Sequence, residues 1–173
     1  HPDYLMQVPG RQPSPSRNQY LLDLGRKEVR QNIFEQMSKI LSSGKIDYIK
    51  WDMNRHLSDI YEADLPADRQ GETYHRYVLG LYDLLEKLDQ AFPDILLEGC
   101  SGGGGRFDAG MAYYEPQIWC SDDSDAIDRL FIQEGTSLVY PQSMMTSHVS
   151  VSPNEQNGRI TPFKTRGIVA MWG

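Results

Sequence analysis

The pattern that most limits the fold of this chain is an alternation of short, β-prone apolar segments with longer amphipathic ones. Residues 28–41 and 74–92 carry apolar side chains at helical spacing and predict two amphipathic helices. The predicted strands cover residues 20–24, 46–52, 95–98, 117–120 and 137–140. A further helix is expected over residues 126–134, and residues 166–172 suit a helix or a strand equally. This order predicts βα units and a parallel sheet, either an open doubly wound sheet or a (β/α)8 barrel.

Composition narrows the function of the chain more than it narrows the fold. With 173 residues, 39% of them hydrophobic, the chain suits one globular domain with a sizeable core. The 24 acidic residues exceed the 17 basic ones and give a formal charge of −7, which disfavours binding to nucleic acids or anionic membranes. No apolar run approaches the ~20 residues that cross a bilayer, and two cysteines are too few for a disulfide scaffold. We therefore expect neither a nucleic-acid nor a membrane partner.

The chain starts with His1 rather than methionine, and no charged and apolar leader precedes this residue. We interpret the chain as an excerpt from a longer protein. A cytoplasmic location is expected, although a targeting signal ahead of His1 would change it.

Polar side chains follow the predicted strands at the ends where both candidate folds bind their ligands. In strand 46–52 the side chains alternate, so that Lys50 and Asp52 share one face. Two charged groups cannot lie in a dry apolar core unless they pair. A structural Lys50–Asp52 ion pair and a functional site are therefore equally good interpretations of this strand.

The next strand ends in a similar way. Glu98 and Cys100 share a face, and four consecutive glycines follow at residues 102–105. A glycine run lets the backbone approach a ligand closely, and a merely flexible loop is the alternative. Phosphate-binding loops are excluded, because no Gly-Lys-Ser/Thr ends the run and a GxGxxG match breaks at Asp108.

The fourth strand leads into an acidic segment, Trp-Cys-Ser-Asp-Asp-Ser-Asp, at residues 119–125. Ser124 or Asp125 can cap the helix that follows. A calcium-binding EF-hand loop is discounted, because Asp128 stands where that loop needs glycine. The four histidines lack the spacing of a metal site, and no GxSxG nucleophile motif occurs.

Carboxylates, a lysine, a thiol and a glycine loop thus follow successive strands. These groups suit carboxylate chemistry on a polar, neutral substrate. Glycoside hydrolysis fits, because it needs two carboxyl groups facing each other across a sugar. Trp119 suits the apolar face of a sugar ring, and packing in the core explains this residue equally well.

Three long motifs occur in this order: KWDMNR at residues 50–55, EGCSGGGGRFD at residues 98–108 and WCSDDSDAIDR at residues 119–129. Together they closely resemble the α-galactosidases of glycoside hydrolase family 36. The resemblance extends over nearly the whole chain, starting at His1.

The resemblance implies an α/β fold that is a partial (β/α)8 TIM barrel with a parallel sheet. A whole barrel needs ~250 residues. Residues 1–173 are therefore expected to be a fragment of a single catalytic domain, with roughly strands three to seven and part of the eighth. The family's amino-terminal β-sandwich and carboxyl-terminal β-domain are expected to be absent from this fragment. The parent protein is expected to be a homo-oligomer, which is a tetramer in the family.

The family's catalytic positions match Asp52, as the nucleophile, and Asp122, as the general acid/base. The positions expected to bind the sugar are Arg17, Lys50, Asn54, Cys100, Gly102 and Trp119. Lys50 is expected to keep Asp52 ionised, and burial is expected to favour the protonated form of Asp122. The resemblance implies no metal and no cofactor. A Cys100–Cys120 disulfide is conceivable, whereas the resemblance implies a free Cys100 that donates to a sugar hydroxyl.

The implied activity is retaining hydrolysis of terminal α-D-galactose from oligosaccharides such as melibiose and raffinose. Galactosyl transfer to another sugar is an alternative, because the raffinose and stachyose synthases are relatives of this family. Another alternative is an inactive piece with a structural or sugar-binding role. For the isolated 173 residues inactivity is expected, since an open half-barrel exposes strand edges.

Overall fold

The structure is a computed structural model that describes all 173 residues, and the chain divides into two compact units. The first unit comprises His1–Asp47 and Asn54–Ile95. The second comprises Tyr48–Met53 and Leu96–Gly173. None of the helices combines the length and the apolar character that crossing a membrane would require.

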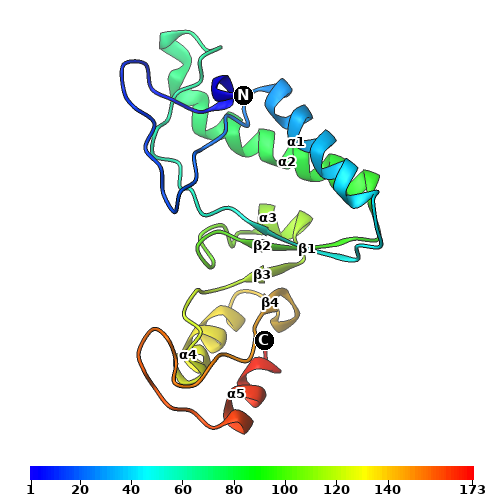
Figure 1. The fold of residues 1–173 in the computed structure, drawn as a ribbon, viewed down its shortest axis with the longest axis vertical. Coiled ribbons are helices and arrows are strands. Elements are labelled where there is room, and N and C mark those ends of the chain that lie inside the picture. Colours follow the sequence, from blue (N-terminus) through cyan, green and yellow to red (C-terminus); the bar gives the residue numbers. More distant parts are fainter. The chain divides into compact units, whose positions relative to one another are not determined.

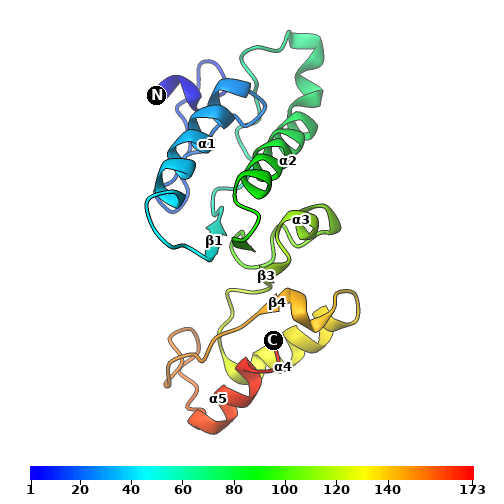
Figure 2. The same cartoon turned by 90° about the vertical axis from the view of Figure 1, so that its right-hand side faces the viewer.

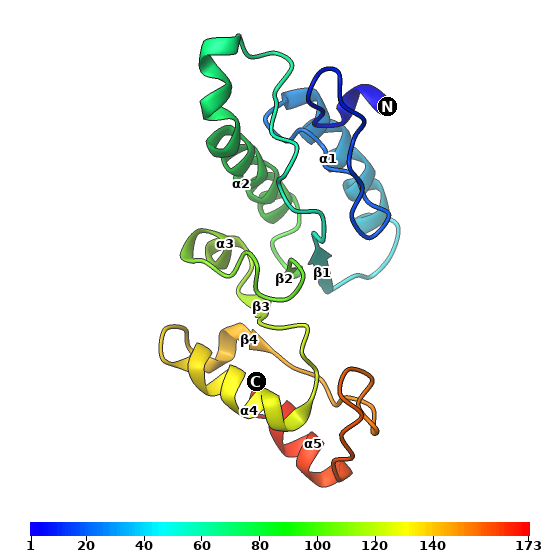
Figure 3. The same cartoon turned by 90° about the vertical axis from the view of Figure 1, so that its left-hand side faces the viewer.

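The first unit is built on helices α1 (Lys27–Leu41) and α2 (Thr73–Ala91), which lie side by side (Figures 1, 2 and 3). Their buried apolar residues are Val29, Leu41, Tyr77, Leu81, Leu84, Leu85 and Leu88. These positions recur at helical spacing, so each helix turns one apolar stripe away from solvent. Both predicted helices are confirmed to within one residue at each end. Short 3-10 helices cover Pro2–Tyr4 and Ala67–Glu72.

The strand predicted at residues 20–24 is wrong. Leu22 makes only an isolated antiparallel bridge with Leu5. The backbone N–H of Met6 donates to the Leu21 carbonyl (2.9 Å), and that of Asp23 donates to the Tyr4 carbonyl (2.9 Å). This segment therefore pairs with the start of the chain rather than joining a sheet, and its buried apolar side chains are Leu21 and Leu24.

The second unit contains a parallel sheet of four strands: β1 (Tyr48–Asp52), β2 (Leu96–Cys100), β3 (Gln117–Trp119) and β4 (Met145–Thr146). The order of the strands in the sheet is their order along the chain. A doubly wound sheet reverses its strand order at a switch point, whereas a (β/α)8 barrel adds each strand beside the one before it. The strand order therefore favours the barrel over the open sheet.

Helices α3 (Ala109–Tyr114), α4 (Ala126–Ser137) and α5 (Phe163–Ala170) belong to the second unit, and α4 packs beside α5 (Figures 1 and 2). A 3-10 helix covers Gln142–Met144. The strand predicted at residues 137–140 is wrong, because α4 continues into this segment and the chain then turns. The N–H groups of Val139 and Tyr140 donate to the Thr136 carbonyl, at 3.1 and 3.0 Å. The fourth strand forms instead at β4, which the sequence analysis missed, and residues 166–172 prove mostly helical.

Candidate active site

The carboxyl ends of the strands place most of the candidate residues in the second unit. Strands β1, β2 and β3 end at Asp52, Cys100 and Trp119. Asp52 pairs in register with Cys100, and Trp119 pairs with Thr146 at the end of β4. Since all four strands are parallel, these side chains meet at one edge of the sheet, where barrel enzymes bind their substrates.

A buried carboxylate, Glu98, organises the sheet below this edge. Lys50 lies opposite Glu98 in the register, and its Nζ lies 3.1 Å from Glu98 Oε1. Thr146 Oγ1 donates to the same oxygen (2.7 Å), and the Tyr48 hydroxyl donates to Oε2. Burial alone would raise the pKa of Glu98, but the hydrogen bonds from Tyr48, Thr146 and Lys50 hold it below its usual range. The ion-pair partner of Lys50 is therefore Glu98 on the neighbouring strand.

The Cys100 thiol lies beside Asp52. Burial raises the pKa of Cys100, and the Asp52 carboxylate raises it further by accepting a hydrogen bond from the thiol. The backbone N–H of Gly103 and the charge of Lys50 act in the opposite direction without reversing the shift. Both cysteines are free, so the conceivable Cys100–Cys120 disulfide does not form. Cys100 is thus a neutral hydrogen-bond donor.

The Trp119 indole connects the sheet to Asp122. Its Nε1–H donates to Asp122 Oδ1 (3.0 Å). The ring centroid lies 4.5 Å from Lys50 Nζ and 4.4 Å from Arg129 Cζ, within the range of cation–π attraction. The His148 imidazole stacks on the same indole, with 4.7 Å between centroids and 5° between planes.

Asp122 itself is exposed in this chain. The residue lies beyond the end of β3, in the loop that leads to α4, and its Oδ1 accepts the hydrogen bond from the Trp119 indole.

Asp125, at the end of the acidic segment, and Asp128, three residues later, make contacts that stabilise the fold. Asp125 caps α4, its carboxylate accepting from the N–H groups of Ile127 (2.9 Å) and Asp128 (3.1 Å). It also pairs with Arg159, as does Asp128 at 3.1 Å. The capping role expected for Asp125 is confirmed. No group of three or more His, Cys, Asp or Glu side chains is arranged to hold a metal ion.

The glycine loop after β2 packs closely against residues 120–122 and leaves no space for a ligand at Gly103 and Gly104. A Cβ on Gly103 would lie 2.8 Å from the Asp122 nitrogen, and a Cβ on Gly104 would lie 2.7 Å from the Cys120 carbonyl oxygen. Gly103 also has a φ of +80°, in the left-handed region. From the sequence, close approach to a ligand and a flexible loop were both open for this glycine run, but the neighbour of these two glycines is the segment that carries Asp122.

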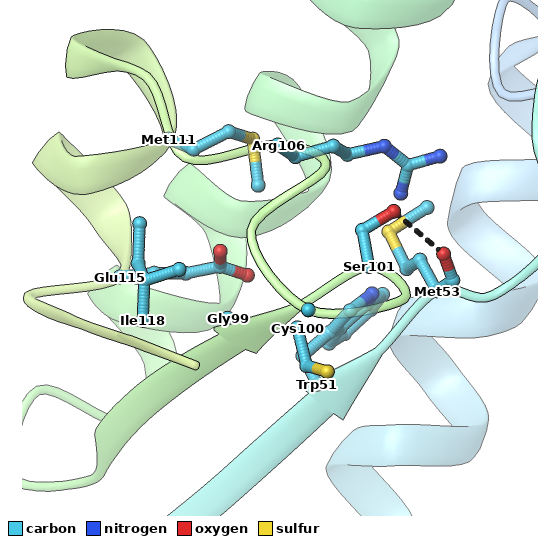
Figure 4. A pocket seen from close by; sticks show the side chains of 10 residues that line it. Trp51, Met53, Gly99, Cys100, Ser101, Arg106, Met111, Glu115 and Ile118 are labelled. Atoms are coloured by element: carbon cyan, nitrogen blue, oxygen red, sulfur yellow. Dashed lines mark hydrogen bonds between the residues drawn. The ribbon is translucent and has the colours of Figure 1, made fainter. Parts of the chain in front are cut away.

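A cavity of about 10 Å³, the size of one water molecule, lies beneath this loop (Figure 4). Its lining includes Glu115, Gly99, Arg106 and Ser101, whose hydroxyl donates to the Met53 carbonyl (2.8 Å). The Glu115 side chain lies over Gly99, where a Cβ would come within 2.1 Å of Glu115 Oε2. Glu115 is 2% exposed, and its Oε1 has no hydrogen-bond partner. Burial raises the pKa of Glu115 to about 7, against the lowering effect of Arg106.

Glu115 should therefore make the stability of the protein fall as the pH rises. The folded state binds the Glu115 proton more tightly than the unfolded state, so its stabilising effect is complete below pH ~4.5 and is lost as the pH passes ~7. The loss is on the order of 3 kcal/mol. We expect Glu115→Gln to make the urea concentration at the unfolding midpoint less dependent on pH between pH 4.5 and 8. At pH 8 the midpoint of this variant is expected to be higher than that of the wild type. The exposed Glu134→Gln is the matched control, and equal pH profiles for wild type and Glu115→Gln would contradict the assignment.

The remaining candidates, Arg17 and Asn54, belong to the first unit. Arg17 and Asn18 both adopt positive φ, at 51° and 60°, in a tight turn closed by reciprocal backbone hydrogen bonds between Ser16 and Gln19. Asparagine adopts this region readily, whereas a residue such as Arg17 costs ~1–2 kcal/mol there, and strain of this kind clusters at functional sites. Asn54 is buried at 7% exposure.

Sequence analysis missed two residues of this site. The role of Glu98 as the common acceptor for β1 and β4 was missed, although its position on the Cys100 face was a usable signal. The contact of His148 with Trp119 was also not predicted, because no local pattern links the two residues.

Comparison with known proteins extends over the full length of the chain. The melibiase family model matches residues 1–173. Alpha-galactosidase Mel36A from Lactobacillus acidophilus is 82% identical over 173 residues, and alpha-galactosidase AgaA from Geobacillus stearothermophilus is 56% identical over the same length. Each match covers 100% of this chain and 24% of the relative, so the chain spans about a quarter of the length of these proteins.

Solved structures agree with these relatives. The crystal structure of the GH36 alpha-galactosidase AgaA matches with a TM-score of 0.95 and 56% identity, over 99% of this chain and 24% of that one. A variant of AgaA in complex with raffinose matches with the same TM-score and 55% identity, over the same shares of the two chains. The whole-chain matches, together with the sequential parallel sheet and its polar carboxyl edge, show that this chain belongs to the melibiase family and has part of the barrel fold of GH36 α-galactosidases.

Proposed function

We propose that this chain carries both catalytic carboxylates of a retaining α-galactosidase. The observation that carries the proposal is the meeting of Asp52, Cys100 and the Trp119–Asp122 pair at the carboxyl ends of adjacent parallel strands. Retaining glycoside hydrolysis needs two carboxyl groups facing one sugar. The names of the relatives, and the complexes of AgaA variants with raffinose and stachyose, support α-galactosides as the substrates.

In the proposed reaction Asp52, as a carboxylate, attacks the anomeric carbon of a terminal α-galactoside. Asp122 donates a proton to the departing glycosidic oxygen, which leaves a covalent galactosyl-enzyme. Asp122 then takes a proton from the water that attacks this intermediate, and galactose leaves with its α configuration retained.

The neighbouring residues have roles that follow from their contacts. The neutral Cys100 thiol is a donor beside Asp52 and is proposed to donate to a sugar hydroxyl once substrate is bound. Lys50, anchored by Glu98, supplies positive charge next to the nucleophile. Trp119 orients Asp122 through its indole N–H. Gly102, in the loop after β2, is proposed to contact the sugar as well. For Arg17 and Asn54, which belong to the first unit, a role in sugar binding is proposed from the family resemblance alone.

We also propose that the chain acts within a longer polypeptide. Its sheet leaves β1 and β4 with one neighbour each, and such open edges are prone to wrong pairing. Residues 1–173 are then one part of a single catalytic barrel, and the 173 residues alone are expected to be inactive. The whole protein is proposed to be cytoplasmic. By the family resemblance it is also proposed to be homo-oligomeric, with an amino-terminal β-sandwich before the barrel and a β-domain after it in the sequence.

The stereochemistry of the product tests the proposed function. A polypeptide of the relatives' length that carries this chain is expected to release α-galactose first from raffinose or melibiose, with the β anomer appearing only through mutarotation. Proton NMR during the first minutes of the reaction measures this order. Initial β-galactose would exclude the retaining mechanism. Predominant transfer of galactose to an added sugar acceptor would assign the chain to the galactosyl transferases instead.

A further inference from the structure

His148 lies two residues beyond the end of β4, with its ring against the Trp119 indole. The two rings are nearly parallel, at 5°, with centroids 4.7 Å apart. His148 is otherwise exposed and helps to line an open groove together with Lys50, Glu98 and Thr146. The contact between the rings therefore links the end of β4 to the residue that ends β3.

The only polar group of the Trp119 indole is its N–H, which forms a hydrogen bond with Asp122. Its N–H donates to Asp122 Oδ1 at 3.0 Å. A rotation of the indole about its side-chain bonds would move this N–H and break the hydrogen bond. The direction of the Asp122 carboxylate consequently depends on what holds the plane of the Trp119 ring.

Two cations and one neutral ring contact this indole. Lys50 Nζ and Arg129 Cζ lie 4.5 and 4.4 Å from the ring centroid. Partial burial, with the charges of Arg129 and Lys50, lowers the pKa of His148, although Glu98 acts in the opposite direction. His148 is thus a neutral ring at neutral pH, and its contribution to Trp119 is the shape of a flat aromatic surface.

We propose that His148 is a positioning residue for the acid/base step, holding the Trp119 indole in the plane that directs Asp122 at the glycosidic oxygen. This inference rests on the proposed function, in which Asp122 protonates the leaving group. In this role His148 acts through Trp119 and Asp122 rather than directly on the reacting atoms. Any flat neutral ring at this position performs the same task.

The dependence of the rate on the leaving group is the readout for this proposal. A substrate with a good leaving group, such as 4-nitrophenyl α-galactoside, needs little help from an acid, whereas melibiose needs full protonation. We expect His148→Ala to lower kcat/KM for melibiose roughly 10- to 100-fold and to change it little for the nitrophenyl substrate. His148→Phe, which keeps a flat ring, is expected to preserve most of the activity on both. All variants are made in a polypeptide of the relatives' length that carries this chain.

Comparing two substrates in one variant removes the effect of misfolded protein, since the ratio of their kcat/KM values does not depend on the folded fraction. Equal losses on both substrates in His148→Ala would overturn the proposal. So would a His148→Phe variant as impaired on melibiose as His148→Ala. His75→Ala, at an exposed histidine of the first unit, controls for the loss of an imidazole elsewhere.

Asp122→Ala separates failure of this inference from failure of the proposed function. If Asp122 is the acid, its removal must itself give a strong preference for the nitrophenyl substrate. With that preference present and His148→Ala unchanged, only the role of His148 fails. Without it, the acid/base assignment fails, and the inference about His148 fails with it.

Discussion

Replacement of Asp52 by glycine is expected to abolish turnover of an aryl α-galactoside, and added azide is expected to restore product formation as β-galactosyl azide. Because Asp52 is the proposed nucleophile, its removal is expected to stop formation of the covalent intermediate, with a loss on the order of 10⁴-fold in kcat or more. The missing side chain leaves room for azide on the face that the carboxylate occupied. Azide attacks the anomeric carbon directly, so the configuration inverts. The rate is followed by release of the nitrophenolate, and the azide product by NMR.

A matched control keeps this experiment from depending on the general effect of losing an aspartate. Asp47, directly before β1, is exposed, and Asp47→Gly should leave the rate near that of the wild type. An unaffected rate in Asp52→Gly, or an azide product of retained configuration, would contradict the assignment of the nucleophile.

Gly103→Ala is the second substitution for which we expect a large effect, a fall in kcat/KM of roughly 100-fold. The new methyl group would lie 2.8 Å from the Asp122 nitrogen and 2.9 Å from Ser121 Cα. Backbone atoms cannot rotate away as the end of a side chain can, so the Ser121–Asp122 segment must shift. A displacement of about 1 Å in a catalytic group can cost two orders of magnitude in rate. The measurement is kcat/KM on melibiose, with the thermal midpoint recorded beside it.

Gly158→Ala is the control for Gly103→Ala, because it separates the strain of a left-handed backbone from the displacement of the Ser121–Asp122 segment. Gly158 has a φ of +72°, close to the +80° of Gly103, but no atom lies within 4 Å of a Cβ built there. Both variants should thus pay the ~1–2 kcal/mol of left-handed strain, while only Gly103→Ala moves Asp122. Equal activities in the two variants would show that the close approach of the glycine loop has no bearing on catalysis.

The sequence could predict those parts of the fold whose structure depends on the residues of a single segment. Helices α1 and α2 have long, complete apolar stripes, and their predicted bounds are accurate to one residue. The strand prediction for residues 20–24 is wrong because an apolar pattern predicts burial but not the pairing partner. Leu22 of this segment pairs with Leu5 and not with a strand of the sheet. The strand prediction for residues 137–140 is wrong because the apolar residues Leu138 and Val139 are highly exposed. Their N–H groups donate to carbonyls of the last turn of α4 instead of to a neighbouring strand.

The candidate site divides along the same line. Alternation within β1 correctly placed Lys50 and Asp52 on one face, since that depends on the strand alone. The contacts of Glu98 with β4 and of His148 with Trp119 join residues far apart in the chain, at a register that no single strand specifies. Long-range pairing of this kind follows from how the strands assemble.

The hydrogen bond from Thr146 to Glu98 has a geometric consequence for the whole edge. Strands β2 and β4 are separated by β3, and in a flat sheet such strands lie roughly 9.5 Å apart. A 2.7 Å contact between their side chains requires the sheet to curl, with this face concave. In a closed barrel, side chains from alternate strands form the inner layers in this way. The polar groups at the strand ends are therefore arranged along an arc, and their side chains point inward towards a common centre.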